Sequence, residues 1–283
     1  MIIYKYTGGF GPATLQKREF KISQPSEFND PFEFFPRMAN VNREHARIKL
    51  NNPSFLQNFY EIQVSNGCLL DFDAFKEEIR KDEESWVDTI FSTYTGHGAA
   101  SPERFYDAAG KRLGVCCFCG GRENILLWSH YADNHRGIAI GFDSDHFEDV
   151  LHRVIYSTER GEYHPLFNAD PDDPYRRVMK TKSPEWSYED EYRIIIAWQV
   201  CTEREIKGRK MHFLEFPPEA VREVVIGCRA PEELRREIIE IAKDDYPHAK
   251  ILQAERHPTD FRIITNEIEQ DAAEQPATAG EST

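Results

Sequence analysis

The stretch SPEWSYEDEYRIIIAW, residues 183–198, places a polar and aromatic turn directly before an apolar run. The β-branched residues of EYRIIIAW predict a strand. Alternate residues of a strand share a face, so Glu191 and Arg193 project to one side of it, and Glu189 joins them if the strand begins early. The stretch therefore predicts two carboxylates about 7 Å apart on one face of a sheet.

Two interpretations of this Glu-x-Glu pair are open. Like charges at this spacing push one pKa upward, which suits a site that handles a proton or stabilises positive charge. In the structural alternative Glu189 is exposed to solvent and Glu191 pairs with Arg193 or Lys182. The sequence is compatible with both.

Short strand-like runs on both sides of a polar, helical region predict the fold. IIYKYTG and FKIS come first, and from residue 114 onward the runs are GVCCFC, GIAIGFD, RVIYS, EYRIIIAW, MHFLEF, EVVIGC, KILQA and FRIIT. Helices at PEELRREIIEIAKDDY, from Ile125 to about Ala132 and from Pro12 to near Glu19 accompany them. We expect an α+β fold with a mixed or mostly antiparallel sheet core and flanking helices.

The segment from 38 to about 110 reads as a helical insertion. In DFDAFKEEIRKDEESWVDTIF, apolar residues recur at helical spacing and Asp73 is the expected N-cap. SPERFYDAAG predicts a further helix, with Ser101 before it and Gly110 after it. We expect a single α+β domain over 1–265 that contains this insertion, with a separate small domain as the alternative. Residues 266–283 are expected to form a disordered acidic tail.

Composition excludes several classes of protein. The formal net charge of −14 disfavours non-specific binding of nucleic acid, which needs a basic surface. No apolar run is long enough for a membrane span, and the N-terminal residues lack the pattern of a secretory signal, so a cytoplasmic protein without membrane contact is expected. Cys116, Cys117 and Cys119 lack the spacing of a zinc site, and we expect buried thiols there and no metal.

Polar and aromatic residues gather in four stretches at expected strand ends or loops: YKY (4–6), EFNDPFE (27–33), LWSHYADNHRG (127–137) and KSPEWSYEDEYR (182–193). Binding residues often lie in such places. Trp128 shares a helical face with Tyr131 and Ala132, so we expect it to pack in the core. His135 falls in the turn before the next strand.

Together these stretches, with a CF strand between them and VVIG after them, resemble the bacterial domain of unknown function 2971 family (DUF2971). The resemblance spans about residues 2 to 230, with the helical insertion between its blocks. The family pattern has a serine after CF where this chain has Cys119.

The layout is also similar to that of the ADP-ribosyltransferases, which implies NAD as a substrate. The resemblance implies that Glu191 is the catalytic carboxylate, which stabilises the cation formed when the nicotinamide–ribose bond breaks. It implies that Glu189 orients the acceptor and that Tyr131 or Trp186 stacks on nicotinamide. The remaining candidates for binding NAD are Lys5, Tyr6, Asn29, Asp30, His135, Lys182 and Arg193. Lys5 stands where that superfamily has His or Arg, and no glycine-rich phosphate loop is present.

A different class of protein remains as the alternative. The same stretches could form the ligand or partner surface of a non-enzymatic effector module in phage defence or stress response. A hydrolase that uses Asp30, Glu33, His130 and Glu191 is a third hypothesis. We expect a small-molecule nucleotide as partner, and a protein or nucleic-acid acceptor is left undefined.

Overall fold

The computed structural model describes residues 1–96, 101–166 and 174–268, and the chain forms two compact units. The first unit comprises Met1–Ser23, Val115–Val154 and Glu185–Thr283, and the second comprises Gln24–Gly114 and Ile155–Pro184. The helical segment expected at about 38–110 lies in the second unit, which also takes in residues on both sides of it and a later stretch of chain.

An eight-stranded sheet forms the first unit, in the order β15-β14-β13-β5-β1-β4-β10-β6. Its strands are β1 (Ile2–Thr7), β4 (Leu113–Cys119), β5 (Ile138–Asp143), β6 (Leu151–Arg153), β10 (Glu191–Ala197), β13 (Val221–Ile226), β14 (Lys250–Arg256) and β15 (Ile263–Glu267). β13 and β14 are parallel and joined by helix α9 (Glu232–Asp245), whereas β5 pairs antiparallel with both β1 and β13. The mixed sheet confirms the predicted α+β class.

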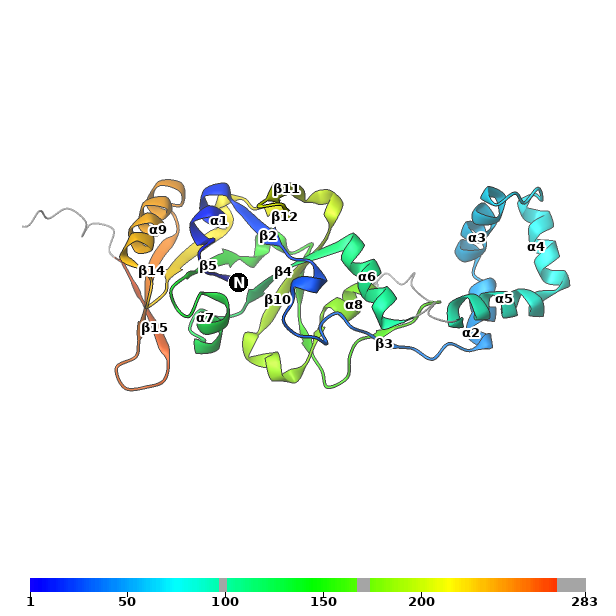
Figure 1. Ribbon diagram of the computed structural model, residues 1–283, viewed down its shortest axis with the longest axis horizontal. Coiled ribbons are helices and arrows are strands. Elements are labelled where there is room, and N and C mark those ends of the chain that lie inside the picture. Colours follow the sequence, from blue (N-terminus) through cyan, green and yellow to red (C-terminus); the bar gives the residue numbers. More distant parts are fainter. Residues whose placement is uncertain (97–100, 167–173, 269–283) are drawn as a thin grey trace, which may run out of the picture. The chain divides into compact units, whose positions relative to one another are not determined.

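Helices cover both faces of this sheet (Figure 1). α1 (Gly11–Lys17) and α9 lie over one face, called here the α9 face, and α7 (Ile125–Tyr131) lies over the other, the α7 face. Ile3 of β1 packs in the core of the α9 face, and its neighbours Tyr4 and Tyr6 pack with Trp128 on the α7 face. The period-2 alternation of a strand thus assigns each residue of β1 to one of two cores.

Aromatic rings fill the core of the α9 face. The ring of Phe20 lies 4.9 Å from that of Phe142 and 5.2 Å from that of Phe118, both edge-to-face, and 4.6 Å from that of Phe216. Aromatic pairs in these geometries add to the stabilisation from buried area. Phe20 therefore anchors its short strand, β2, to the main sheet.

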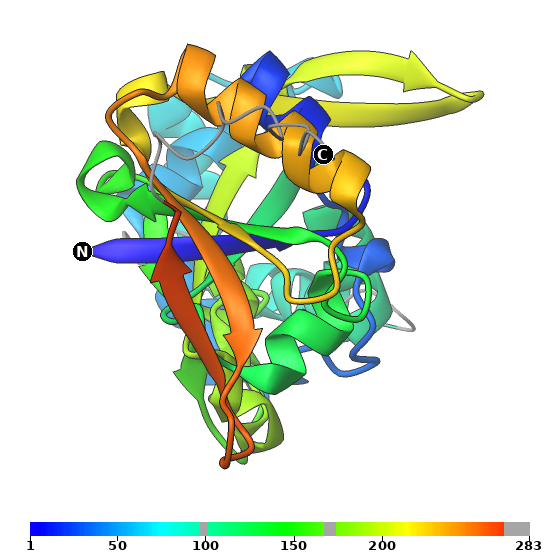
Figure 2. The same cartoon turned by 90° about the vertical axis from the view of Figure 1, so that its left-hand side faces the viewer.

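β2 (Glu19–Ile22) belongs to a separate three-stranded antiparallel sheet with β11 (Thr202–Ile206) and β12 (Arg209–Glu215). Lys207 and Gly208, both at positive φ, close the β11–β12 hairpin, as a two-residue turn of this kind requires. Figure 2 shows this hairpin, in yellow, extending beside α1, in blue. β11 was not predicted, because its polar residues lack an apolar face.

The second unit is largely helical. Its helices are α2 (Arg43–Leu50), α3 (Pro53–Ser65), α4 (Phe72–Lys81), α5 (Glu83–Thr95), α6 (Pro102–Arg112) and α8 (Pro174–Met179). Two small parallel sheets pair β3 (Arg37–Met38) with β8 (Glu162–Tyr163), and β7 (Ile155–Tyr156) with β9 (Thr181–Lys182). Within the described residues of both units, the 3₁₀ helices are η1 (Pro25–Glu27), η2 (Ser144–Phe147), η3 (Pro184–Glu189), η4 (Trp198–Val200) and η5 (Pro218–Ala220).

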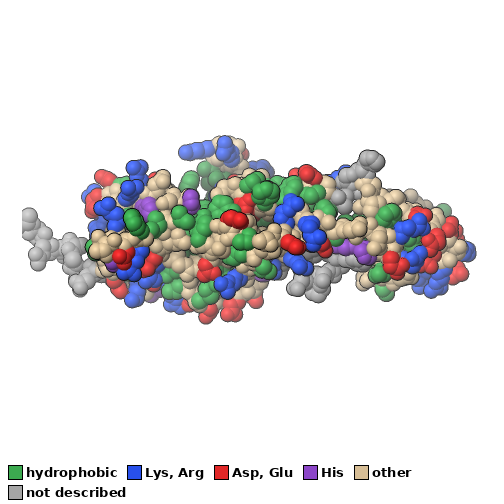
Figure 3. Space-filling model, turned by 90° about the horizontal axis from the view of Figure 1, so that it is seen from below, with side chains coloured by type: hydrophobic (Ala, Val, Ile, Leu, Met, Phe, Trp, Pro, Cys, Tyr) green, Lys and Arg blue, Asp and Glu red, His purple; other side chains and the backbone are tan. Residues whose placement is uncertain are grey.

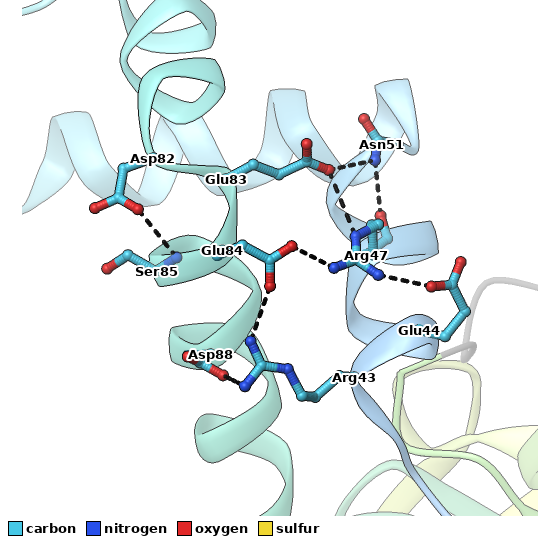
Figure 4. Close-up of polar contacts among 9 residues, drawn as sticks. All are labelled: Arg43, Glu44, Arg47, Asn51, Asp82, Glu83, Glu84, Ser85 and Asp88. Atoms are coloured by element: carbon cyan, nitrogen blue, oxygen red, sulfur yellow. Dashed lines mark hydrogen bonds and ion pairs between the residues drawn. The ribbon is translucent and has the colours of Figure 1, made fainter.

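Charged side chains join α2 to α5. Arg43 binds Glu84 and Asp88, and Arg47 binds Glu44 and Glu84 (Figure 4). Acidic and basic side chains alternate over the surface of helices α2–α5 (Figure 3). Exposed pairs of this kind contribute little each, so the buried apolar residues between these helices supply most of their stability.

Several predicted boundaries were wrong. One long helix over residues 71–91 is instead divided at Asp82, which caps α5, and Asp71 rather than Asp73 caps α4. Gly110 lies inside α6, although Ser101 caps that helix as predicted. The helix that begins near Pro12 ends at Lys17, before Glu19.

Two further boundaries differ at the C-terminal half. RVIYS is split between β6 and β7. The tail predicted from residue 266 begins with two residues of β15, and residues 269–283 lie outside the described part of the chain. Among the described helices, none has the length and apolar character needed to cross a membrane.

We predict that Phe20→Ala lowers the free energy of unfolding of the first unit by about 3–5 kcal/mol, because the truncation leaves a cavity among packed rings. Phe261→Ala is the matched control, since Phe261 is 101% exposed, and we expect a change within about 0.5 kcal/mol. Urea denaturation followed by circular dichroism measures both. Equal effects of the two substitutions would contradict this account of the core.

Candidate functional site

The 3₁₀ helix η3 leads directly into β10 and places Glu189 and Glu191 at the start of the strand. Asp190 between them adopts a positive φ of 41°, which turns the chain from the helix into the strand. Its carbonyl accepts a hydrogen bond from the amide of Gly120. A Cβ at position 120 would lie 2.0 Å from Asp190 Oδ2, so any residue other than glycine there requires the Asp190 side chain to move.

Glu191 and Arg193 form a buried ion pair on β10. The Arg193 Nε donates to Glu191 Oε1 at 2.8 Å, and the Arg193 Nη2 donates to Glu191 Oε2 at 3.0 Å. Glu191 is 2% exposed and Arg193 is 0% exposed. Two buried charges are tolerated only when such paired hydrogen bonds offset their desolvation. The pairing of Glu191 with Arg193 confirms one part of the structural alternative from the sequence.

Glu189 is buried rather than exposed, which corrects the other part of that alternative. It is 2% exposed, and its Oε1 accepts a hydrogen bond of 2.7 Å from the hydroxyl of Tyr131 at the end of α7. Asn124 caps the other end of α7 and donates a hydrogen bond to the carbonyl of Tyr188 in η3. Both ends of the helix are thus fastened to the segment that carries the carboxylates.

Tyr6 completes this face of the sheet. Its hydroxyl donates to the carbonyl of Gly121 at 2.8 Å, and its ring packs edge-to-face on Trp128 at 5.1 Å. Trp128 is fully buried, as predicted. Burial raises the pKa of the Tyr6 hydroxyl, so it stays protonated at neutral pH.

Cys117 of β4 lies beside Glu191. Burial raises the pKa of the Cys117 thiol well above its usual value, and the Glu191 carboxylate raises it further. The thiol is therefore protonated at neutral pH and is not an activated nucleophile. We call Tyr6, Tyr131, Glu189, Glu191 and Arg193 the carboxylate site. Trp186 belongs to the same segment, half-buried, with its ring 6.1 Å from that of Tyr188.

Other predicted residues lie elsewhere. Lys5 follows Tyr4 and precedes Tyr6 on β1, so it projects to the α9 face, where its Nζ donates to the carbonyl of Cys117 at 3.0 Å. In the second unit, Asp30 and Lys182 line a hollow of about 260 Å³, where Lys182 pairs with Glu33 at 3.8 Å. Asn29, also in the second unit, and His130 are exposed.

His135 lies in a turn, as predicted, and its backbone conformation is unusual. Asp133, Asn134 and His135 all have positive φ angles, from 46° to 70°. The Nε2 of His135 is 3.1 Å from the hydroxyl of Ser129, and the residue lines a hollow of about 460 Å³ together with Arg229 and Arg256. Its position is therefore distinct from the carboxylate site.

A second ion pair on the α7 face, between the buried Glu223 and the partly exposed Arg122, was missed in the sequence. Arg122 Nη1 donates to Glu223 Oε2 at 2.8 Å and to the Tyr4 hydroxyl at 2.9 Å. Burial raises the pKa of Tyr4 to about 12. The available signal was an acidic residue, Glu223, inside the apolar strand VREVVI. Within residues 1–96, 101–166 and 174–268, no group of three or more His, Cys, Asp or Glu side chains is arranged to hold a metal ion.

We predict that Arg229→Gln raises the pKa of His135. Burial and then the positive charge of Arg229 lower this pKa from its ordinary value, and the substitution removes the second cause. Because the folded state disfavours protonation here, stability should fall as the pH drops below about 6.5, where the unfolded chain takes up the proton.

A pH titration by NMR, with the His135 signal assigned through His135→Gln, measures the shift. Arg256→Gln is the control, because Arg256 lines the same hollow but is not a cause of the shift. A His135 pKa that Arg229→Gln leaves unchanged would contradict this assignment of the electrostatics.

Comparison with known proteins identifies one family. The family described as "Protein of unknown function (DUF2971)" matches residues 127–194, which run from α7 to the middle of β10 and contain Tyr131, Glu189 and Glu191. No curated protein and no solved structure matches the chain. The match covers two of the four polar stretches and confirms the family predicted from the sequence. Residues 127–194 of the chain are thus similar to the DUF2971 family, and the match does not extend to the rest of the span over which the sequence resembles it.

Proposed function

We propose that the chain is an NAD-using enzyme similar to ADP-ribosyltransferases and that the carboxylate site performs its chemistry. The observation that carries the proposal is the presence of two buried carboxylates where η3 leads into β10: Glu189, held by the Tyr131 hydroxyl, and Glu191, held by Arg193. Buried ionisable groups with specific partners are concentrated at functional sites. Both residues lie in the segment that matches the family.

The reaction breaks the bond between nicotinamide and ribose. The bonding electron pair leaves with nicotinamide, and positive charge develops on the ribose. In this proposal Glu191 stabilises that charge, and Arg193 fixes the carboxylate in place before the reaction.

Glu189 and Tyr131 serve the second substrate in this proposal. The hydrogen bond from the Tyr131 hydroxyl fixes the Glu189 carboxylate, which orients the acceptor nucleophile and takes up its proton. The ring of Tyr131 or that of Trp186 stacks on nicotinamide. Lys5 is not part of this site, since it projects to the opposite face of the sheet. Consumption of cellular NAD would slow cell growth. A role in defence or stress response would therefore be observed as slower growth of cells that produce the active protein.

We predict that the purified chain releases nicotinamide from NAD, alone or in the presence of cell lysate, and that Glu191→Gln slows the release at least about 100-fold. Glu189→Gln should retain release into water and lose transfer to an acceptor. Nicotinamide is followed by chromatography, and transfer by labelled NAD.

Glu223→Gln is the matched control. Like Glu191, Glu223 is buried and paired with an arginine on the α7 face of the sheet, but it lies outside the carboxylate site. Its partner Arg122 is partly exposed, so thermal melting of both variants compares the structural cost of each substitution. Release should persist in Glu223→Gln once its thermal melting shows a folded protein. Absence of release by the folded wild-type chain would contradict the proposal and favour a non-enzymatic module, as would equal losses in Glu191→Gln and Glu223→Gln.

A further inference from the structure

A groove of about 670 Å³ opens on the α9 face of the first unit, away from the carboxylate site. Its walls come from α1, β1, β2 and the β11–β12 hairpin. Most of the lining is apolar and is supplied by Phe10, Ala13, Phe20, Ile206, Met211 and Phe213. A groove of this volume and lining is typical of sites for small organic ligands.

A half-buried lysine forms part of the lining. The Lys5 ammonium can donate three hydrogen bonds. It donates to the carbonyl of Cys117 at 3.0 Å and also hydrogen-bonds the Cys116 side chain, and among the described residues it has no ion pair with a carboxylate. It also lies 5.9 Å from the centre of the Phe118 ring. A cation removed from water in this way gains from an anion placed in the groove.

The rim of the groove adds further positive charge. Lys17, Lys207 and Arg209 are exposed there, and within the described part of the chain none of the three forms an ion pair. Glu19 is the acidic residue of the lining, and it is paired with Arg204. In a chain with a net charge of −14, this local excess of cations is complementary to a negatively charged ligand.

We propose that this groove binds a single amphiphilic anion, with an alkyl body and a carboxylate or phosphate head. The head pairs with the Lys5 ammonium, and the alkyl body lies against Met211 and Phe213 of β12. The rim cations attract the ligand from solution. Since Lys5 is half-buried, a single chain can reach it, whereas the flat surface of a bilayer cannot. This site is independent of the proposed transferase activity.

Isothermal titration of dodecanoate, kept below its micelle-forming concentration, into the whole chain tests the proposal. We expect one site with a Kd below about 100 µM. Lys5→Met should raise the Kd at least tenfold. Met211→Trp, which fills the groove and keeps Lys5, should abolish binding. Lys111→Met, an exposed lysine of the second unit, is the matched control and should leave the Kd unchanged. Thermal melting establishes that each variant is folded.

The chemistry of the head and the source of the ligand are tested in parallel. Dodecyl phosphate should bind and dodecylammonium should not, because the head must be anionic. Equal binding of dodecylammonium, or an unchanged Kd in both folded Lys5→Met and Met211→Trp, would overturn the proposal. Binding to anionic vesicles without binding of monomeric dodecanoate would also overturn it, in favour of a membrane surface. The loss of dodecanoate binding in these variants without loss of nicotinamide release would separate this site from the transferase.

Discussion

Successive side chains of a β-strand point to opposite faces of the sheet, and this constraint organises the first unit. On β1, Tyr4 and Tyr6 pack under α7, while Ile3 and Lys5 belong to the face covered by α1 and α9. On β10, Ile194 belongs to the core of the α9 face, which leaves Glu191 and Arg193 on the α7 face. One layer of backbone therefore separates Lys5, in the groove of the α9 face, from its sequence neighbour Tyr6, in the carboxylate site. A shift of register by one residue would exchange them.

Charged side chains on the two faces of the sheet have different kinds of partner. On the α7 face, Glu191 and Glu223 are each bonded to an arginine, and Glu189 accepts from Tyr131. The same low-dielectric surroundings that strengthen these bonds make the loss of either partner costly. On the α9 face, Lys5 contacts a carbonyl oxygen and an aromatic ring but no carboxylate among the described residues. The carboxylates named on the α7 face thus have partners within the protein, whereas Lys5 on the α9 face can still pair with an anionic ligand.

Local patterns in the sequence predicted the elements that build both sites. The isoleucine run identified β10, the spacing of Trp128 and Ala132 identified the buried side of α7, and the i, i+2 relation placed Glu191 beside Arg193. Each of these depends on residues a few positions apart. The break at Asp82 was missed because one apolar stripe runs through both α4 and α5, and only the capping bond of Asp82 to the Ser85 amide reveals it.

These local patterns do not predict contacts between residues that are far apart in the sequence. Arg122 and Glu223 are 101 positions apart, and their pairing depends on β13 lying next to β5 and near β1. The groove at Lys5 requires the β11–β12 hairpin, about 200 residues later, to pair with β2. Sequence alone therefore grouped Lys5 with Glu191 and Tyr131 in one site, and the sheet assigns them to different faces.

The separation of the two sites is the central claim, and a crystal structure with bound 12-bromododecanoate tests it most directly. The anomalous signal of bromine locates the end of the alkyl chain without reference to the protein. We predict a bromine position against Met211 or Phe213, with the carboxylate of the ligand within hydrogen-bonding distance of Lys5 Nζ. A bromine position on the α7 face, near Tyr6 or Tyr131, would contradict the account and return Lys5 and Glu191 to a common site.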